Sequence, residues 1–328
     1  MKYIALEEAF VIPELAERQP MPGGGVPHLP ARFEPDLVEK FSARLADLTE
    51  YRLPEMDDAG IDVQVLSLTV PGMQIDVEPE IACRNARFAN DYTAELIAKQ
   101  PDRFAALAAL PLQDPDAAAR ELERAVRELG LRGALVNDCI TGPGGRYLDA
   151  PEYDVVWSAL ESLDVPLYLH PGAPPADQWQ VLQGRPELQG AMWSWAAEVG
   201  AHAMRIILGG VFDRHPGATL ILGHMGEFLP FQRSRLDSRY LTLDTDGALK
   251  QLPSAYLGTN VVFTNSGVFS PATVAGAVAE VGAEAVLFSV DYPYESSFDA
   301  VAGFERTPLA AADRDLVAHG NAERLLKL

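Results

Sequence analysis

The chain has 328 residues, of which 48% are apolar, and a mean hydropathy of -0.01, values typical of a globular protein with a sizeable core. A formal net charge of -21 argues against nucleic acid and anionic membrane surfaces as partners. Two cysteines, Cys83 and Cys139, are too few for a disulfide framework, so a reducing cytoplasm is the expected compartment. No signal-peptide pattern opens the chain, and no apolar run reaches membrane-spanning length.

Short apolar runs alternate with helix-like stretches along the whole chain. Eight runs predict strands, at residues 3–6, 63–68, 104–110, 133–136, 165–169, 218–222, 261–264 and 286–290. Helical periodicity is clearest at residues 78–99, 115–129, 151–163, 189–213, 271–281 and 310–326. The alternation predicts βα units and a parallel sheet, and eight of them predict an α/β fold closed into a (β/α)8 TIM barrel. An open, doubly wound sheet is the competing fold, but no GxGxxG motif follows the first strand.

Two loops are predicted to shape the barrel mouth. Residues 17–34 are rich in glycine and proline and predict a loop over the mouth, with His28 as a candidate contact. Residues 171–188 are proline-rich and predict a second loop directly after the fifth strand. Because the chain shows no internal repeat, linker or low-complexity tract, residues 1–328 are expected to form a single domain.

Four predicted strands stop at a carboxylate or an imidazole. Glu7, His170, His224 and Asp291 follow strands one, five, six and eight. Side chains at this end of parallel barrel strands converge over the barrel axis, where they can bind a divalent cation and leave positions open for a substrate. Taken singly, each has a plainer interpretation, such as a solvated strand end, a loop or core histidine, or a turn residue. Their joint placement favours a metal site.

The sequence around these four positions carries further motifs. Residues 5–10 read ALEEAF, 169–171 LHP, 223–227 GHMGE and 289–293 SVDYP. In this order they resemble the amidohydrolase-related decarboxylases, which include the aminocarboxymuconate semialdehyde, γ-resorcylate and 2,3-dihydroxybenzoate decarboxylases. The resemblance covers nearly the whole chain and is greatest to the two hydroxybenzoate enzymes. It implies a (β/α)8 barrel of the metal-dependent hydrolase superfamily with a single divalent metal.

The same resemblance places Glu7, His170 and Asp291 on metal-ligand positions. A common family pattern has a histidine two residues after the first ligand, and here that position is Ala9. Two carboxylates and one imidazole form a hard ligand set, which favours Mg²⁺ or Mn²⁺ over Zn²⁺. No lysine ends a predicted strand, so the bridging carboxylated lysine of binuclear relatives is not expected. One ion per chain is therefore predicted.

The residues expected to move protons are Asp291, His224 and Glu227. Glu227 follows His224 by three residues, close enough to orient the imidazole and fix its tautomer. The alternative is that this pair only caps the start of a helix. Asp291 is the expected proton donor, assisted by His224 and Glu227, and the opposite assignment with His224 as donor stays open.

Three residues are expected to bind the substrate. The family pattern points Arg235 toward the substrate carboxylate or into a neighbouring subunit, and the alternative is a solvated basic stripe with Arg239. Trp193 and Tyr294, together with Trp195, are candidates for the wall of an aromatic pocket, with a place in the core as the alternative. A homo-oligomer, either dimer or tetramer, is expected.

The leading hypothesis is non-oxidative decarboxylation of an ortho-hydroxybenzoate by a carbon–carbon lyase. Direct loss of CO₂ would leave a costly aryl carbanion, whereas protonation of the carboxylate-bearing carbon beforehand avoids it. A hydrolase or hydratase that activates metal-bound water on the same fold is the second hypothesis. A catalytically inactive, ligand-binding barrel is the third, because Ala9 replaces a possible metal ligand.

Overall fold

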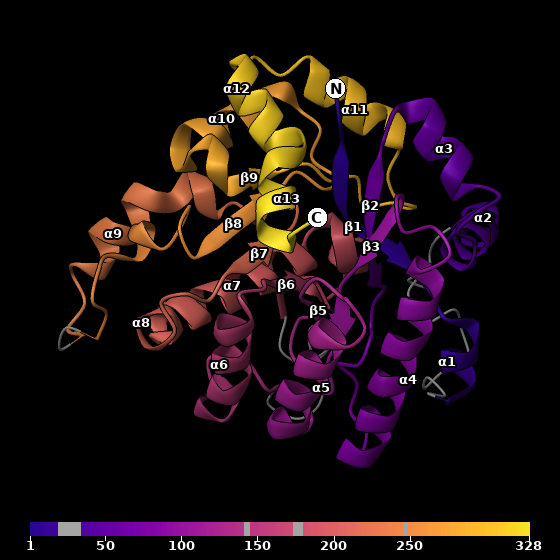
Figure 1. Cartoon of the computed structure of the whole chain (residues 1–328). Helices are drawn as coiled ribbons and strands as arrows, with labels where there is room; N and C mark the ends of the chain where they lie inside the picture. Colours follow the sequence, from indigo (N-terminus) through magenta and orange to yellow (C-terminus); the bar gives the residue numbers. More distant parts are fainter. Residues whose placement is uncertain (19–33, 141–144, 173–179, 246–247) are drawn as a thin grey trace.

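The computed structural model describes residues 1–18, 34–140, 145–172, 180–245 and 248–328, and helices surround its central strands (Figure 1). The strands are β1 (Ile4–Phe10), β2 (Val63–Leu68), β3 (Phe104–Ala106), β4 (Ala108–Ala109), β5 (Ala134–Asn137), β6 (Leu167–His170), β7 (Leu220–Leu222), β8 (Val261–Thr264) and β9 (Val286–Leu287). The loop predicted at 17–34, with His28, lies almost wholly outside the described residues, as does the 173–179 part of the second loop.

Every pairing between these strands is parallel. Hydrogen bonds join β1, β2 and β3 in one sheet and β4 through β9, in chain order, in another. A parallel bridge between Leu6 and Ser289 and a hydrogen bond of 3.3 Å from Leu6 N to Phe288 O join the first strand to the last. The circuit of strands confirms the predicted (β/α)8 barrel.

The predicted strand at 104–110 is divided into β3 and β4 at Leu107. On one side of the break, Leu107 N donates to Leu66 O of β2, and on the other, Ala108 N donates to Gly133 O beside β5. The backbone therefore changes its hydrogen-bonding partner from β2 to the β5 side within one residue. The two short strands together occupy one position in the barrel, which is why eight predicted runs correspond to nine strands in the described residues.

Helices follow most strands of the barrel. They are α1 (Pro13–Arg18), α2 (Pro35–Ala46), α3 (Arg52–Ala59), α4 (Pro79–Ile97), α5 (Pro115–Arg127), α6 (Asp154–Leu163), α7 (Ser194–Leu208), α8 (Val211–Arg214), α9 (Arg233–Tyr240), α10 (Pro271–Val281), α11 (Ser297–Glu305), α12 (Ala311–Asp315) and α13 (Asn321–Leu326). The sequence did not predict α1, α2, α3 or α11. None of the helices in the described ranges is long and apolar enough to cross a membrane.

The predicted helix at 189–213 was wrong as a continuous element, whereas the one predicted at 310–326 is helical without interruption from Ala311 to Leu326. The first breaks between α7 and α8 at Gly209 and Gly210, where Gly210 has a left-handed φ of 70° that a helix does not allow. The second contains a π-helical segment, η8 (Leu316–Gly320), between α12 and α13. Within this segment the Val317 carbonyl accepts a hydrogen bond of 2.9 Å from Phe288 N, beside the last strand.

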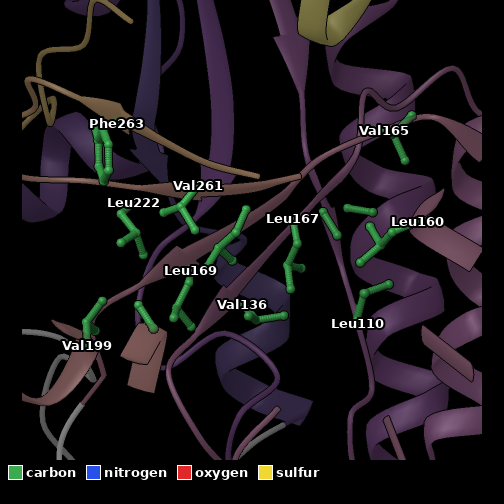
Figure 2. Packing of buried hydrophobic residues seen from close by; sticks show 14 of the residues in the cluster. Leu110, Val136, Leu160, Val165, Leu167, Leu169, Val199, Leu222, Val261 and Phe263 are labelled. Atoms are coloured by element: carbon green, nitrogen blue, oxygen red, sulfur yellow. The ribbon is translucent and has the colours of Figure 1, made fainter. Parts of the chain in front are cut away.

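The core has two layers, which are separated by the strands. Successive strand residues alternate between them: Leu167 and Leu169 belong to the outer layer, and Tyr168 belongs to the inner one. In Figure 2, Leu160 of α6 and Val199 of α7 approach the outer faces of the strands. The inner layer fills the barrel with Ile4, Leu6, Val65, Leu135, Tyr168, Ile221, Val262 and Leu287. Polar side chains at the carboxyl ends of the strands therefore lie above the apolar side chains that fill the barrel interior.

Candidate metal centre and active site

β1 contains a bulge at two successive buried glutamates and continues past it to Phe10, so Glu7 does not end the strand as predicted. The pairing register between β1 and β2 shifts between Ala5 and Glu8, and Glu7 has a left-handed φ of 65°. Glu7 is 1% exposed and Glu8 is not exposed at all. In a regular strand these side chains would point to opposite faces, and the bulge changes the direction in which each carboxylate points.

Glu7, His170, His224 and Asp291 converge as the sequence predicted. Each offers one ligand atom, and these atoms all lie within 4.8 Å of one another. Glu7 Oε1 lies 3.3 Å from His170 Nε2 and 3.1 Å from His224 Nε2. His224 Nε2 in turn lies 3.8 Å from Asp291 Oδ2. Four side chains that are distant in the sequence thus surround one point at the carboxyl end of the barrel.

The tautomer of His170 follows from its backbone contact. Its Nδ1 lies 2.8 Å from the Pro171 carbonyl oxygen, and because a carbonyl can only accept, Nδ1 carries the hydrogen. Burial lowers the pKa of His170, which favours the neutral ring. Its Nε2 lone pair then faces Glu7 Oε1, an arrangement of two acceptors that a cation between them would satisfy.

The burial and charge of Glu7 Oε1 also indicate a cation at this point. It is buried and accepts no hydrogen bond from the described residues. Burial alone would raise the pKa of Glu7, but the charge of His224 outweighs it and lowers the pKa, so the carboxylate is ionised. A buried anionic oxygen without a donor costs free energy. The donor set therefore fits a divalent cation.

A tight turn after β7 presents His224 and Glu227 to the site. All five residues of the turn have positive φ: His224, Met225, Gly226, Glu227 and Phe228. The turn is anchored by Met225 N, which donates to Thr264 O at 2.7 Å. His224 Nδ1 lies 2.7 Å from Glu227 Oε1. Burial opposes the charged ring, but the charges of Glu7 and Glu227 raise the pKa of His224 well above its usual value.

Glu8 holds the backbone on both sides of Asp291. Val290 N donates to Glu8 Oε1 at 3.0 Å, and Tyr292 N donates to Glu8 Oε2 at 3.3 Å. Asp291 itself has a left-handed φ of 79°, so these bonds support a strained residue. Burial, together with the charge of Glu7, raises the pKa of Asp291. The sequence analysis missed Glu8, although its place directly after Glu7 was a signal.

A pocket of about 420 Å³ opens beside these side chains. Its lining includes the predicted residues Trp193 and Tyr294, as well as Trp195. Tyr294 donates to or accepts from Thr69 at 3.0 Å, and Trp193 remains 48% exposed. Arg235 is exposed on α9 and is not part of this lining. The described wall is mainly apolar and aromatic, which suits a small planar ligand.

The pocket also has an acidic side that the sequence analysis did not predict. Glu295 lines it, and its side chain lies with those of His224 and Asp291 around Gly267. No motif singled out Glu295, because it lies in a turn, four residues after Asp291. The other missed residues, Tyr168, Thr264 and Ser266, lie beneath Glu7 and have no local sequence signal.

Comparison with known proteins places this geometry in a family. The family model described as amidohydrolase matches residues 28–328. The chain belongs to the amidohydrolase family. Among other amidohydrolase-related proteins, the γ-resorcylate decarboxylase of Rhizobium sp. (strain MTP-10005) is 42% identical over 330 residues, which cover 99% of this chain and 98% of that one.

Solved structures extend the similarity of this amidohydrolase to the whole fold. A crystal structure of 2,6-dihydroxybenzoate decarboxylase complexed with 2,6-dihydroxybenzoate matches with a TM-score of 0.90 at 41% identity, over 100% of both chains. A dihydroxybenzoic acid decarboxylase from Polaromonas sp. JS666, with bound manganese and the inhibitor 2-nitroresorcinol, matches with a TM-score of 0.91 at 38% identity. This match covers 100% of this chain and 97% of the other. The predicted family of amidohydrolase-related decarboxylases is confirmed.

Proposed function

We propose that this amidohydrolase is a carboxy-lyase that removes CO₂, without an oxidant, from an ortho-hydroxybenzoate. The observation that carries the proposal is the position of Glu7 Oε1, a buried carboxylate oxygen that faces the Nε2 atoms of His170 and His224 beside an aromatic-lined pocket. The 42% identity to a γ-resorcylate decarboxylase supports the reaction class. γ-Resorcylate, which carries hydroxyl groups on both sides of its carboxylate, is the first substrate to test.

Glu7, His170 and Asp291 would hold one divalent ion, with Mg²⁺ or Mn²⁺ favoured over Zn²⁺ because two of three ligands are carboxylates. The bound manganese of the Polaromonas relative supports the same choice. When bound, the ion would chelate the phenolic oxygen and one carboxylate oxygen of the substrate and favour the phenolate. Ala9 removes one imidazole from the common family pattern, but His224 brings a second ring nitrogen to the same point.

Asp291 is the proposed proton donor to the ring carbon that bears the carboxylate. Its carboxylate lines the pocket and lies 3.8 Å from His224 Nε2, a position from which it could relay a proton to a bound ring. Protonation gives a dienone-like intermediate, which loses CO₂ and regains aromaticity. His224 would assist through Nε2, and Glu227 would orient the ring through Nδ1. His224 is the alternative donor, because its Nε2 faces the same point.

Trp193 and Tyr294 are proposed to flank the aromatic ring, since both line the pocket. Arg235 does not line the pocket of its own chain, which favours the alternative that it serves a neighbouring subunit of a homo-oligomer. The exposed apolar side chains of Phe231, Leu241 and Leu243, just before and after α9, are consistent with such an interface. We also propose that residues 1–328 form a single domain and that the protein is cytoplasmic.

The proposed activity is tested by measuring CO₂ release from a panel of mono- and dihydroxybenzoates. Metal-free protein is supplied with Mg²⁺, Mn²⁺ or Zn²⁺ in separate reactions, and the aromatic product is identified in each. We expect release from γ-resorcylate with Mn²⁺ or Mg²⁺. Product formed by water addition or hydrolysis, without CO₂, would support the hydrolase or hydratase alternative. Metal binding without turnover of any benzoate would support the inactive, ligand-binding barrel.

A further inference from the structure

We infer that three buried hydroxyl groups beneath Glu7 restrict this carboxylate to one metal-binding oxygen and thereby select against large cations such as Ca²⁺. The hydroxyls belong to Tyr168 of β6, Thr264 of β8 and Ser266, two residues beyond β8. None of the three residues is exposed. The inference rests on the proposed metal site and concerns how this chain's own residues shape it.

Two of the hydroxyls donate to the same oxygen of Glu7. Tyr168 and Ser266 both make short hydrogen bonds to Oε2, and a carboxylate can only accept them. Glu7 Oε2 thus has two charge-assisted bonds, whereas Oε1 has none from the described residues.

The remaining contacts determine the direction of the network. The Tyr168 proton is directed to Glu7, so the oxygen of Tyr168, 2.8 Å from Thr264 Oγ1, must accept the Thr264 proton. Thr264 then has no proton left for Glu7, in agreement with its distance of 3.5 Å from Oε2. Ser266 accepts in turn from His224 N at 2.9 Å. Two short chains, from Thr264 through Tyr168 and from His224 through Ser266, therefore end on Oε2.

Close packing keeps Glu7 in this orientation. A methyl group at Gly223, directly after β7, would lie 2.6 Å from Glu7 Oε2, 3.1 Å from Oε1 and 3.0 Å from the Tyr168 hydroxyl, so the backbone there packs closely against the carboxylate. The carboxylate cannot rotate to exchange its oxygens without breaking both hydrogen bonds. Oε1 consequently stays directed at His170 and His224.

This arrangement disfavours bidentate binding by Glu7. Ca²⁺ takes six to eight oxygen ligands and often uses both oxygens of a carboxylate, whereas Mg²⁺ demands octahedral geometry at shorter distances. An oxygen that already accepts two charge-assisted hydrogen bonds is a weak second ligand. The hydroxyl cluster therefore favours small six-coordinate ions, and it does so through residues that do not themselves touch the metal.

The test measures metal affinity directly, without turnover. Metal-free wild-type protein and the variants Tyr168→Phe and Ser266→Ala are titrated with Mn²⁺, with free Mn²⁺ followed by electron paramagnetic resonance, and with Ca²⁺ in competition. Tyr153→Phe is the matched control, because Tyr153 is also fully buried but its hydroxyl bonds to the Leu112 carbonyl, away from the site. Thermal melting of each protein checks that it folds.

We expect the two cluster variants to bind Mn²⁺ about 10- to 100-fold more weakly, the range for loss of a partner that orients a metal ligand. The affinity for Ca²⁺ relative to Mn²⁺ should rise at least about tenfold, because Oε2 becomes free to bind. Tyr153→Phe should match wild type in both measures. If folded Tyr168→Phe and Ser266→Ala bind both ions as the control does, the inference is wrong while the metal site stands. Failure of the wild-type protein to bind Mn²⁺ would instead overturn the metal site and the inference together.

Discussion

His224 Nδ1 lies 2.7 Å from Glu227 Oε1, so the hydrogen on this ring nitrogen points at the carboxylate. The opposite ring nitrogen, Nε2, is thereby aimed at Glu7 Oε1, 3.1 Å away, and at Asp291 Oδ2, 3.8 Å away. The turn that makes this contact possible consists of residues with positive φ. The pair therefore makes its contact within one non-helical turn, which directs the imidazole toward Glu7 and Asp291.

The first prediction concerns this pair. If Glu227 orients His224, Glu227→Gln should lower turnover while leaving the metal content and the fold intact. His224→Ala should lower turnover by at least about 10²-fold, the lower limit for a general acid or base. Loss of the orienting partner should cost less than loss of the imidazole. Steady-state kinetics with elemental analysis of the same samples checks this, and near-wild-type turnover in both variants would make the pair structural.

The second prediction concerns substrate geometry. If chelation through a phenolic oxygen drives the reaction, a hydroxyl group must lie ortho to the carboxylate. Benzoates that carry a hydroxyl only at the para position should be inert, and those with an ortho hydroxyl should release CO₂. Side-by-side rates for 4-hydroxybenzoate and 2-hydroxybenzoate measure the difference. Equal rates would contradict chelation.

The third prediction concerns metal content. We expect about one divalent ion per chain, and its loss in Asp291→Ala or His170→Ala, because both belong to the proposed set of three ligands. At a metal concentration 100 times the dissociation constant, binding should stabilise the folded protein by about 2.7 kcal/mol. Elemental analysis and melting curves with increasing Mn²⁺ measure both effects. Two ions per chain, or a melting temperature that Mn²⁺ does not change, would contradict a mononuclear site.

The fourth prediction concerns Gly226, in the turn between His224 and Glu227. Its φ is 71°, and a methyl group there would lie 2.2 Å from Phe263 Cδ1. Gly226→Ala should therefore combine a left-handed alanine, about 1–2 kcal/mol, with overpacking, about 1–3 kcal/mol. Gly130→Ala is the control, since its φ is 74° but no atom lies within 4 Å of the added methyl group.

Urea denaturation of both variants separates the two contributions. We expect Gly130→Ala to lower the free energy of unfolding only by the cost of the left-handed alanine. Gly226→Ala should lower it clearly more. Equal losses would mean that Phe263 moves aside at no cost and that the turn tolerates a side chain.

The sequence alone predicted the barrel and the residues that converge at the candidate metal centre because both have local signals. Strands of a parallel barrel are buried on both faces, so they appear as short apolar runs, and a polar residue at the end of a run is conspicuous. Glu7, His170, His224 and Asp291 were all found in this way. The break at Leu107 was not, because the residues on both sides of it are equally apolar and only the partner strands differ.

Only the tertiary structure decided how these residues are supported. Tyr168 is 161 residues from Glu7 in the sequence, and Ser266 is 259 residues away, yet both donate to the same carboxylate oxygen. Nothing local in the chain marks a tyrosine in the barrel interior as such a donor. Glu8 supports Asp291 because closure of the barrel brings β1 beside the residues after the last strand, 282 residues away in the sequence. Such contacts depend on strand register and closure of the barrel, which are properties of the whole fold and not of any one segment.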